Sequence, residues 1–319
     1  HQPFEVTTLR RDVETDGRRA VVAFTEDWAE DAQRRDFRMN ALYTALDGEL
    51  FDPTGGGLED IAQRRVVFVG DAETRIREDY LRILRFFRFF AWYGQGAPDA
   101  AGLAACEKLK QGLAGISVER IWMETKKLLG APGPMPSMTA MEESGVLRQL
   151  FPQSKGLDLL RQLVVLENAA NLGPEPMVRF LSLFWKDAKA VVNVTGQLKM
   201  SNEESQRLRW AAQNDAPIRA GMTPAAMRGA LYKSGVGVFR DRVLLQWAQD
   251  LASTASWRQL YDDAMGWRRP VLPVTREDLL ERGIPEGPPV GAGLRKLETY
   301  WIDSDFTLTR DDLLSKIKR

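Results

Sequence analysis

The chain has 319 residues, of which 44% are hydrophobic and 28% are charged, and 44 Lys and Arg balance 44 Asp and Glu. This length allows two or three domains with cores of their own, and the composition excludes a disordered or membrane-embedded chain. Zero net charge excludes a global attraction for polyanions, so nucleic-acid binding would need local basic patches. One cysteine, Cys106, and one histidine, His1, exclude a disulfide framework, a Ser-His-Asp triad and a zinc site of cysteines or histidines.

The sequence also predicts where the protein resides. No segment approaches the roughly 20 apolar residues of a membrane span, and the N-terminus lacks a secretory pattern. We therefore expect a cytoplasmic protein without a membrane partner, and a single buried Cys106 fits a reducing compartment. The chain opens with His1 inside a predicted strand, so we expect its beginning to be missing.

The first predicted elements are two strands. Residues 2–9 (QPFEVTTL) and 20–24 (AVVAF) are rich in β-branched and aromatic residues, and the polar segment DVETDG between them is typical of a loop. Glu5 lies in the middle of the first strand, where its simplest interpretation is a carboxylate on the solvent-facing side.

Two polar motifs follow the strands. The stretch RRDFRMNALY follows the acidic segment EDWAED and predicts a helix that continues through Tyr43; its polar residues are Arg34, Arg35, Asp36 and Asn40. They form either a basic helix start with a capping aspartate or a phosphate-binding group, for which arginine is well suited. The stretch DPTGGGLEDI, with Asp52 and Gly55, predicts a tight turn and a short helix over 58–62. Residues 66–69 (VVFV) predict a short strand or a buried extended segment, and from Asp71 onward the pattern is almost wholly helical.

Residues 75–90 (RIREDYLRILRFFRFF) carry the most informative pattern. Apolar residues recur at a spacing of three and four, which predicts one helix with one face against a core. A polar ridge of residues three apart runs along the same helix: Asp79, Arg82, Arg85 and Arg88. This ridge is either a solvated face with ion pairs such as Glu78 with Arg82, or a device that reads a nucleobase.

The second alternative has a chemical basis. Cytosine and adenine present an amino donor beside a ring-nitrogen acceptor, so Asp79 would accept from the amino group while Arg82 donates to the acceptors. Uracil and guanine present an N–H where Arg82 also presents one. An Asp and an Arg one helical turn apart would therefore accept C and A and refuse U and G.

The run EDYLR with ILRFFRF, together with RRDFRMNALY and DPTGGGLEDI in this order, resembles class II CCA-adding enzymes (tRNA nucleotidyltransferases) and the related bacterial poly(A) polymerases. The resemblance implies an α+β nucleotidyltransferase head, here incomplete, followed by an all-α neck, body and tail, and a predominantly helical chain. We expect the head over 1–69, the neck over 70–130, the body over 131–216 and a tRNA-binding tail over 217–319.

The resemblance also implies roles for residues. The RRD motif, residues 34–36, and Asn40 would contact the sugar and the triphosphate. The helix with Asp79, Arg82, Arg85 and Arg88 would recognise the base. Structural support falls to Asp52, Gly55 and Glu78, and also to Glu119 and Arg120, which open a helix that Ser117 caps and that ends near Leu129. Glu5 would support a pair of metal-binding carboxylates, Asp-x-Asp, that the family carries upstream of this strand and that this chain lacks. We therefore predict no metal ligand in this chain and no nucleotide transfer by the chain alone.

The implied reaction is magnesium-dependent addition of C, C and A to tRNA 3′ ends from CTP and ATP. A poly(A) polymerase is one alternative, although zero net charge argues against sequence-independent binding of arbitrary RNA ends. A non-catalytic RNA-binding remnant is the other.

Farther along, residues 130–136 (GAPGPMP) predict a linker, and MEESGVLRQLFPQ predicts an amphipathic helix. Residues 282–298 resemble the C-terminal segment of many bacterial CCA-adding enzymes, where a helix starts after a Gly-Pro turn and its N-terminus would face an RNA phosphate. A simple turn between packed helices is the alternative.

Overall fold

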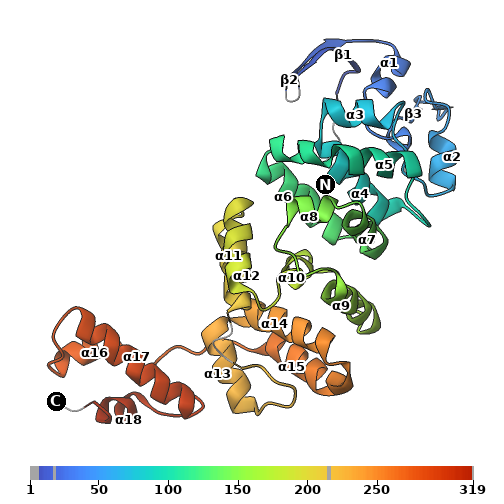
Figure 1. Cartoon of the computed structure of the whole chain (residues 1–319). Coiled ribbons are helices and arrows are strands. Elements are labelled where there is room, and N and C mark those ends of the chain that lie inside the picture. The colour runs from blue at the N-terminus through green and yellow to red at the C-terminus, as the bar shows by residue number, and fades with distance from the viewer. Residues whose placement is uncertain (1–6, 17–18, 214–216, 318–319) are drawn as a thin grey trace. The chain divides into compact units, whose positions relative to one another are not determined.

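The computed structural model describes residues 7–16, 19–213 and 217–317 and divides into two compact units, His1–Gln206 and Arg207–Arg319. The first unit begins with short antiparallel pairs of strands and continues as helices, and the second unit contains helices and no strand among its described residues (Figure 1). An α+β head followed by helical parts is therefore confirmed as the fold class. None of the helices in the described ranges combines the length and the apolar character that crossing a membrane requires.

Two small antiparallel sheets open the first unit. β1 (Arg10–Asp16) pairs with β2 (Arg19–Phe24), from Arg10 opposite Phe24 to Asp16 opposite Arg19, and β3 (Tyr43–Thr44) pairs with β4 (Leu50–Phe51). The prediction that DVETDG is a loop is wrong over Asp12–Asp16, which belongs to β1. Ladder hydrogen bonds join backbone groups, so a polar sequence can extend a strand when a partner strand lies alongside.

Helices make up the rest of the first unit. They are α1 (Trp28–Gln33), the 3-10 helix η1 (Arg38–Asn40), α2 (Gly57–Ala62), α3 (Ala72–Glu78), α4 (Leu81–Tyr93), α5 (Ala100–Leu109), the 3-10 helix η2 (Lys110–Gly115), α6 (Val118–Leu129), α7 (Met135–Glu143), α8 (Val146–Leu150), α9 (Asp158–Ala169), α10 (Pro176–Ser182) and α11 (Ala188–Gln197). α12 (Asn202–Ala212) contains the boundary between the units. The prediction of one helix over MEESGVLRQLFPQ is wrong. Gly145 adopts a left-handed φ of 73°, and this residue separates α7 from α8.

The second unit contains α13 (Pro224–Ser234), α14 (Val236–Gln249), the 3-10 helix η3 (Leu251–Ser253), α15 (Thr254–Gly266), α16 (Arg276–Glu281), α17 (Pro288–Asp303) and α18 (Arg310–Ser315). Tyr232, Leu279, Leu297 and Trp301 belong to a buried cluster that joins α13 to the last three helices. The predicted helix start after the Gly-Pro turn is confirmed, because α17 begins at Pro288 directly after Gly287, whose φ is 104°.

An aromatic cluster fixes α4 against the strand-bearing part of the chain. Phe37 forms a β-bridge with Phe68, and its ring lies 4.9 Å from Phe68 and 5.1 Å from Phe89, while Phe86 stacks on Phe68 at 5.5 Å. Residues 66–69 are thus the extended segment that the sequence predicts, with Val66, Phe68 and Val69 buried. On its other side α4 packs against α6 and α7. The segment before Phe37 is thereby held beside the polar face of α4.

The glycine-rich turn before α2 is confirmed, and its glycines have a steric reason. Gly55 has a left-handed φ of 69°, and a Cβ on Gly57 would lie 2.5 Å from the carbonyl oxygen of Arg38. Asp52 closes the turn, since its Oδ2 accepts the N–H of Gly57 at 2.7 Å and that of Leu58 at 3.2 Å. The turn therefore presses the start of α2 against η1.

Candidate nucleotide-binding site

The predicted single helix over residues 75–90 is interrupted at its acidic residue. α3 ends at Glu78 and α4 begins at Leu81, and between them Asp79 has extended backbone angles (φ −152°, ψ 104°). Its carboxylate Oδ1 accepts the N–H of Leu81 at 3.1 Å. Aspartate competes in this way for backbone N–H groups and so favours helix ends over helix interiors, which explains why the prediction of one helix is wrong.

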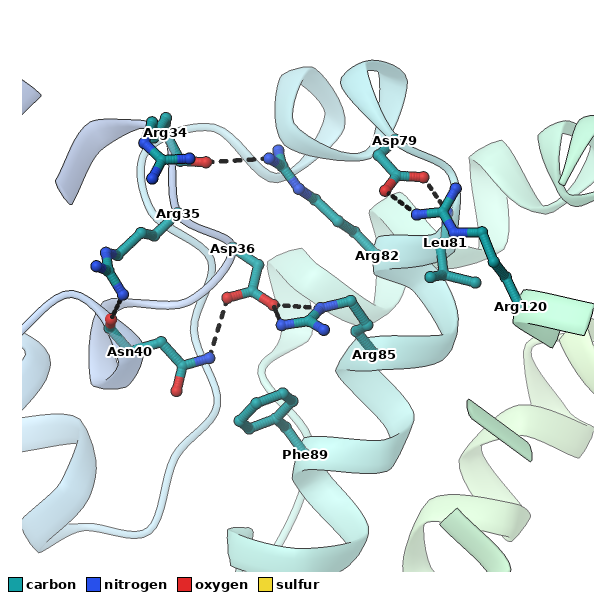
Figure 2. Close-up of a pocket in the computed structure, with 10 residues that line it drawn as sticks. All are labelled: Arg34, Arg35, Asp36, Asn40, Asp79, Leu81, Arg82, Arg85, Phe89 and Arg120. Atoms are coloured by element: carbon teal, nitrogen blue, oxygen red, sulfur yellow. Dashed lines mark hydrogen bonds and ion pairs between the residues drawn. The ribbon is translucent and has the colours of Figure 1, made fainter. Parts of the chain in front are cut away.

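Asp79 and Arg82 therefore point to different partners. Asp79 Oδ2 accepts from Nη2 of Arg120, on α6, at 2.6 Å. Arg82 donates through Nη1 to the Glu78 carboxylate at 2.5 Å and through Nη2 to the carbonyl oxygen of Arg34 at 3.1 Å. The Glu78–Arg82 ion pair is thus present, but it joins two helices instead of lying within one. Figure 2 shows the Arg82 guanidinium directed toward Arg34, with Arg120 beside Asp79.

The RRD segment lies opposite α4. The predicted helix through Tyr43 is wrong here too, since α1 ends at Gln33, only Arg38–Asn40 form a 3-10 turn, and Tyr43 belongs to β3. The backbone is held extended instead, because the N–H of Arg38 donates to Val67 and the N–H of Val69 donates to Asp36. Tertiary pairing with residues 67–69 has overridden a helical pattern.

Asp36 joins this segment to α4. Its nearly buried carboxylate accepts through Oδ1 from the backbone N–H of Phe37 and the side-chain amide of Asn40, each at 3.0 Å, and through Oδ2 from Nε of Arg85 at 2.6 Å. Arg85 in turn lies over the ring of Phe89, 5.5 Å from its centroid. Asp36 therefore orients Asn40 and Arg85.

Arg34 and Arg35 are anchored on a carboxylate that the sequence analysis did not single out. Nε of Arg34 donates to Oδ1 of Asp31 at 2.8 Å, and Nε and Nη2 of Arg35 donate to Oδ2 at 3.0 and 2.9 Å. Asp31 lies on α1 and its residue is 1% exposed. The acidic segment EDWAED was visible in the sequence, but nothing in it distinguished this buried carboxylate from its exposed neighbours.

These side chains enclose a pocket of about 570 Å³, a volume typical of small-molecule sites. Ten residues line it: Arg34, Arg35, Asp36, Asn40, Asp79, Leu81, Arg82, Arg85, Phe89 and Arg120 (Figure 2). Five arginines against two aspartates give the lining a net charge of +3, which suits a polyanionic ligand. Phe89 and Leu81 were missed as lining residues because only the polar ridge of this helix was considered as a binding surface.

The remaining predicted residues lie outside this lining. Arg88 approaches the buried Glu124 of α6 at 2.6 Å and lies over Phe89, so it faces the α4–α6 packing and not the pocket. Arg38 donates to both oxygens of Asp60 in α2 at 2.7 and 2.8 Å.

The predicted supporting residues make local contacts. Glu78 pairs with Arg75 as well as Arg82, Asp52 closes the glycine turn, and Glu119 pairs with Lys199 at the surface. Ser117 precedes α6 as predicted, although its side chain makes no capping hydrogen bond. Glu5 lies outside the described residues.

The described part of the chain does not fit a magnesium site. Within residues 7–16, 19–213 and 217–317 there is no group of three or more His, Cys, Asp or Glu side chains placed to hold a metal ion. The carboxylates of the pocket are instead engaged by arginines: Asp36 by Arg85 and Asp79 by Arg120.

Comparisons with known proteins identify the family. A family model described as the poly A polymerase head domain matches residues 1–67, and one described as a probable RNA- and SrmB-binding site of polymerase A matches residues 99–164. The chain resembles the crystal structure of the Bacillus stearothermophilus CCA-adding enzyme in complex with CTP, with a TM-score of 0.71, 26% identity and coverage of 94% of this chain and 74% of that one. The fold is also that of a Thermotoga maritima CCA-adding enzyme solved with tRNA, with a TM-score of 0.57, 18% identity and coverage of 91% and 73%.

Relatives match along the whole chain. The mitochondrial CCA tRNA nucleotidyltransferase 1 of Danio rerio is 36% identical over 99% of this chain and 73% of its own length, and that of Homo sapiens is 35% identical over 99% and 72%. The CCA-adding enzyme of Latilactobacillus sakei is 30% identical over 99% and 79%. With the three motifs, the arginine-lined pocket and this similarity together, the chain belongs to the family of CCA-adding tRNA nucleotidyltransferases.

Proposed function

We propose that this protein adds C, C and A to the 3′ ends of tRNA, using CTP and ATP and no nucleic-acid template. The observation that carries the proposal is the pocket between the RRD segment and α4, where five arginines and Asp79 line one space. Relatives that match almost the whole chain are named for CCA addition, which favours this reaction over poly(A) synthesis and over a non-catalytic role.

The two sides of the pocket suit the two parts of a nucleoside triphosphate. Arg34 and Arg35 offer planar guanidinium groups, which bind phosphate oxygens in a bidentate manner. Asp79, at the other side, offers a carboxylate acceptor to the amino group that cytosine and adenine share. We propose that Arg34, Arg35, Asn40 and Arg85 hold the sugar and phosphates and that Asp79 and Arg82 read the base.

Base reading by Arg82 requires a local exchange of partners. Its Nη groups donate to Glu78, to the Arg75 carbonyl and to the Arg34 carbonyl, whereas the group beside Asp79 is Arg120. A base between Asp79 and Arg82 would replace part of these contacts, so its donors and acceptors must match what it displaces. A mismatched base would leave a guanidinium or a carboxylate without a partner.

Nucleotide binding tests the proposal directly. We would measure the Kd of CTP, ATP, UTP and GTP for the chain and for Asp79→Ala, with Asp158→Ala on the exposed start of α9 as a matched control. The chain should prefer CTP and ATP, and Asp79→Ala should lose about 1–3 kcal/mol of this discrimination while binding of tRNA stays the same. Equal affinity for the four nucleotides, or unchanged selectivity in Asp79→Ala, would contradict the assignment of Asp79.

The RNA partner and the domain roles complete the proposal. We propose a head over 1–69, a neck over 70–130, a body over 131–216 and a tail over 217–319 that binds tRNA through local basic patches. A-form RNA is read mainly through its backbone and 2′-hydroxyls, so tRNA should bind more tightly than unstructured RNA of equal length. Equal affinity, with an equally steep loss in salt, would favour the poly(A) polymerase alternative.

Two further points rest on the sequence and the family. We propose that the reaction requires magnesium, which would stabilise charge on the transferring phosphoryl group. We also propose a cytoplasmic location, although the zebrafish and human relatives carry the word mitochondrial in their names. Cell fractionation distinguishes the two compartments.

A further inference from the structure

Asp31 is a carboxylate beside the pocket that accepts many hydrogen bonds, and the function proposed above gives it no role. It is 1% exposed, and four groups from three parts of the chain donate to it. These donors are the backbone N–H of Arg10 at 3.1 Å, the guanidinium groups of Arg34 and Arg35, and the hydroxyl of Tyr43 at 2.7 Å. Asp31 itself does not line the pocket, whereas both arginines do.

These donors keep the carboxylate charged. Burial by itself would raise the pKa of Asp31, but the hydrogen bonds from Tyr43, the Arg10 backbone, Arg35 and Arg34 outweigh it and hold the pKa well below its ordinary value. Tyr43 is held as a donor as well, because burial and the hydrogen bond to Asp31 raise its pKa to about 12. The group is therefore a fixed anion behind two cations at neutral pH.

The contacts leave the outer edges of both arginines available. Arg34 uses Nε and Nη2 on Asp31, and among the described residues its Nη1 group has no hydrogen-bond partner. Arg35 uses Nε and Nη2 on Asp31 and donates through Nη1 to the carbonyl oxygen of Asn40 at 3.0 Å. An arginine carries five N–H groups, so each keeps donors for a ligand. Figure 2 places both side chains across the pocket from Arg82 and Arg85.

We propose that Asp31 is a positioning residue for triphosphate binding: with Tyr43 it holds Arg34 and Arg35 side by side so that their remaining N–H groups face the β- and γ-phosphates, which CMP lacks. This inference rests on the proposed function and extends it to a residue that touches no nucleotide. Long arginine side chains lose conformational freedom when they bind, and a carboxylate that orients them beforehand removes part of that cost. Asp31 also removes one of the two positive charges, so the gain comes from orientation and not from charge.

Asp31→Asn in the full chain tests this. Ordering one rotamer-rich side chain costs about 0.5–1.5 kcal/mol, and two such side chains correspond to a loss of about fivefold to 150-fold in affinity. We expect CTP to bind more weakly by this factor, CMP to bind as before, and the ratio of CTP to UTP affinity to stay unchanged. Asp158→Asn, on the exposed start of α9, should change none of these values.

Two variants separate positioning from a merely structural role. Tyr43→Phe removes the hydrogen bond that Tyr43 donates to Asp31 and the one that it accepts from Nε of Arg35, and it leaves the carboxylate. It should therefore weaken CTP binding about twofold to tenfold, again without affecting CMP. In Arg34→Ala, which lacks one of the two oriented side chains, Asp31→Asn should cost less than in the wild-type chain.

The outcomes are distinct. Unchanged CTP affinity in Asp31→Asn, or an equal loss for CTP and CMP, would overturn the positioning role. If Asp31→Asn does not fold, Tyr43→Phe decides, and an equal effect on CTP and CMP there would overturn the role as well. Failure of the wild-type chain to prefer CTP and ATP over UTP and GTP would instead refute the proposed function on which the inference rests.

Discussion

Arg179 forms a buried ion pair whose loss should destabilise the helical part of the first unit. It and Glu167 each have a side chain 1% exposed, and Nε and Nη2 of Arg179 contact Oε2 of Glu167 at 2.8 and 2.6 Å. Nη1 donates to the carbonyl oxygens of Leu129 and Ala131, each at 2.6 Å. Leu129 is the last residue of α6, the helix that carries Arg120, so this arginine ties the C-terminal end of that helix to α9 and α10.

Arg179→Met keeps an unbranched side chain and removes its charge and its N–H groups. It leaves the Glu167 carboxylate buried without a cation, a change that costs about 3–5 kcal/mol in comparable sites. Arg179→Met with Glu167→Met should lose less than Arg179→Met alone, because no buried charge is left. The double variant should still lose stability, since two buried carbonyl groups lack their donor.

Urea unfolding followed by circular dichroism would measure these losses. Arg161→Met, on an exposed position of α9, is the matched control and should change the free energy of unfolding by less than about 0.5 kcal/mol. A loss below about 1 kcal/mol for Arg179→Met, or a double variant less stable than the single one, would refute the reasoning.

The stability loss in Arg179→Met should also depend on pH, and the pKa of Glu167 determines in which direction. Burial raises the pKa of Glu167 above its ordinary value despite the hydrogen bond and charge of Arg179, and removal of Arg179 raises it further. A raised folded-state pKa means that the folded chain binds the proton first as the pH falls. The loss of stability in Arg179→Met should therefore shrink as the pH falls through the raised pKa toward the ordinary value of 4.5.

Three further predictions concern single residues. Gly57→Ala places a Cβ 2.5 Å from the Arg38 carbonyl oxygen and should cost about 1–3 kcal/mol in urea unfolding, whereas Gly115→Ala, where no heavy atom lies within 4 Å, should cost little. Tyr43→Phe should remove from the ultraviolet titration of the native chain one ionisation near pH 12, because burial and Asp31 raise the pKa of Tyr43 to about 12; a lost step near the ordinary value of 10.0 would contradict this. Cys106 should react with a thiol reagent only after unfolding, because burial raises its pKa and covers its sulfur; rapid labelling of the native chain would contradict its burial.

The sequence predicted the parts of the fold that depend on local signals. The turn at Gly55, the helix opened by Ser117 and the helix after Gly287 follow from residues whose backbone preferences are strong. The order of the three motifs was enough to identify the family. Burial of Cys106 followed from its side chain.

The sequence did not predict how the site side chains are paired. The break at Asp79 depends on a hydrogen bond to Leu81 and an ion pair with Arg120, 41 residues away. The extended backbone at Phe37, directly before η1, depends on the hydrogen bond from the N–H of Arg38 to Val67, which a helical pattern in one segment cannot reveal. Tertiary contacts decide such positions when local preferences are weak.

The pairing explains how a chain of zero net charge can hold five arginines in one pocket. Each guanidinium has a carboxylate on one edge: Asp31 behind Arg34 and Arg35, Asp36 behind Arg85, Glu78 behind Arg82, and Asp79 beside Arg120. In a continuous helix, Asp79 and Arg82 would be neighbours on one face and would pair with each other. The break gives each of them a different partner.

The four carboxylates reduce the local charge to +1, so selection of a ligand must depend on the directions of fixed N–H groups more than on attraction at a distance. Nucleotide affinity should consequently fall only modestly between low and physiological salt, and a steep fall would show that unpaired charge dominates binding.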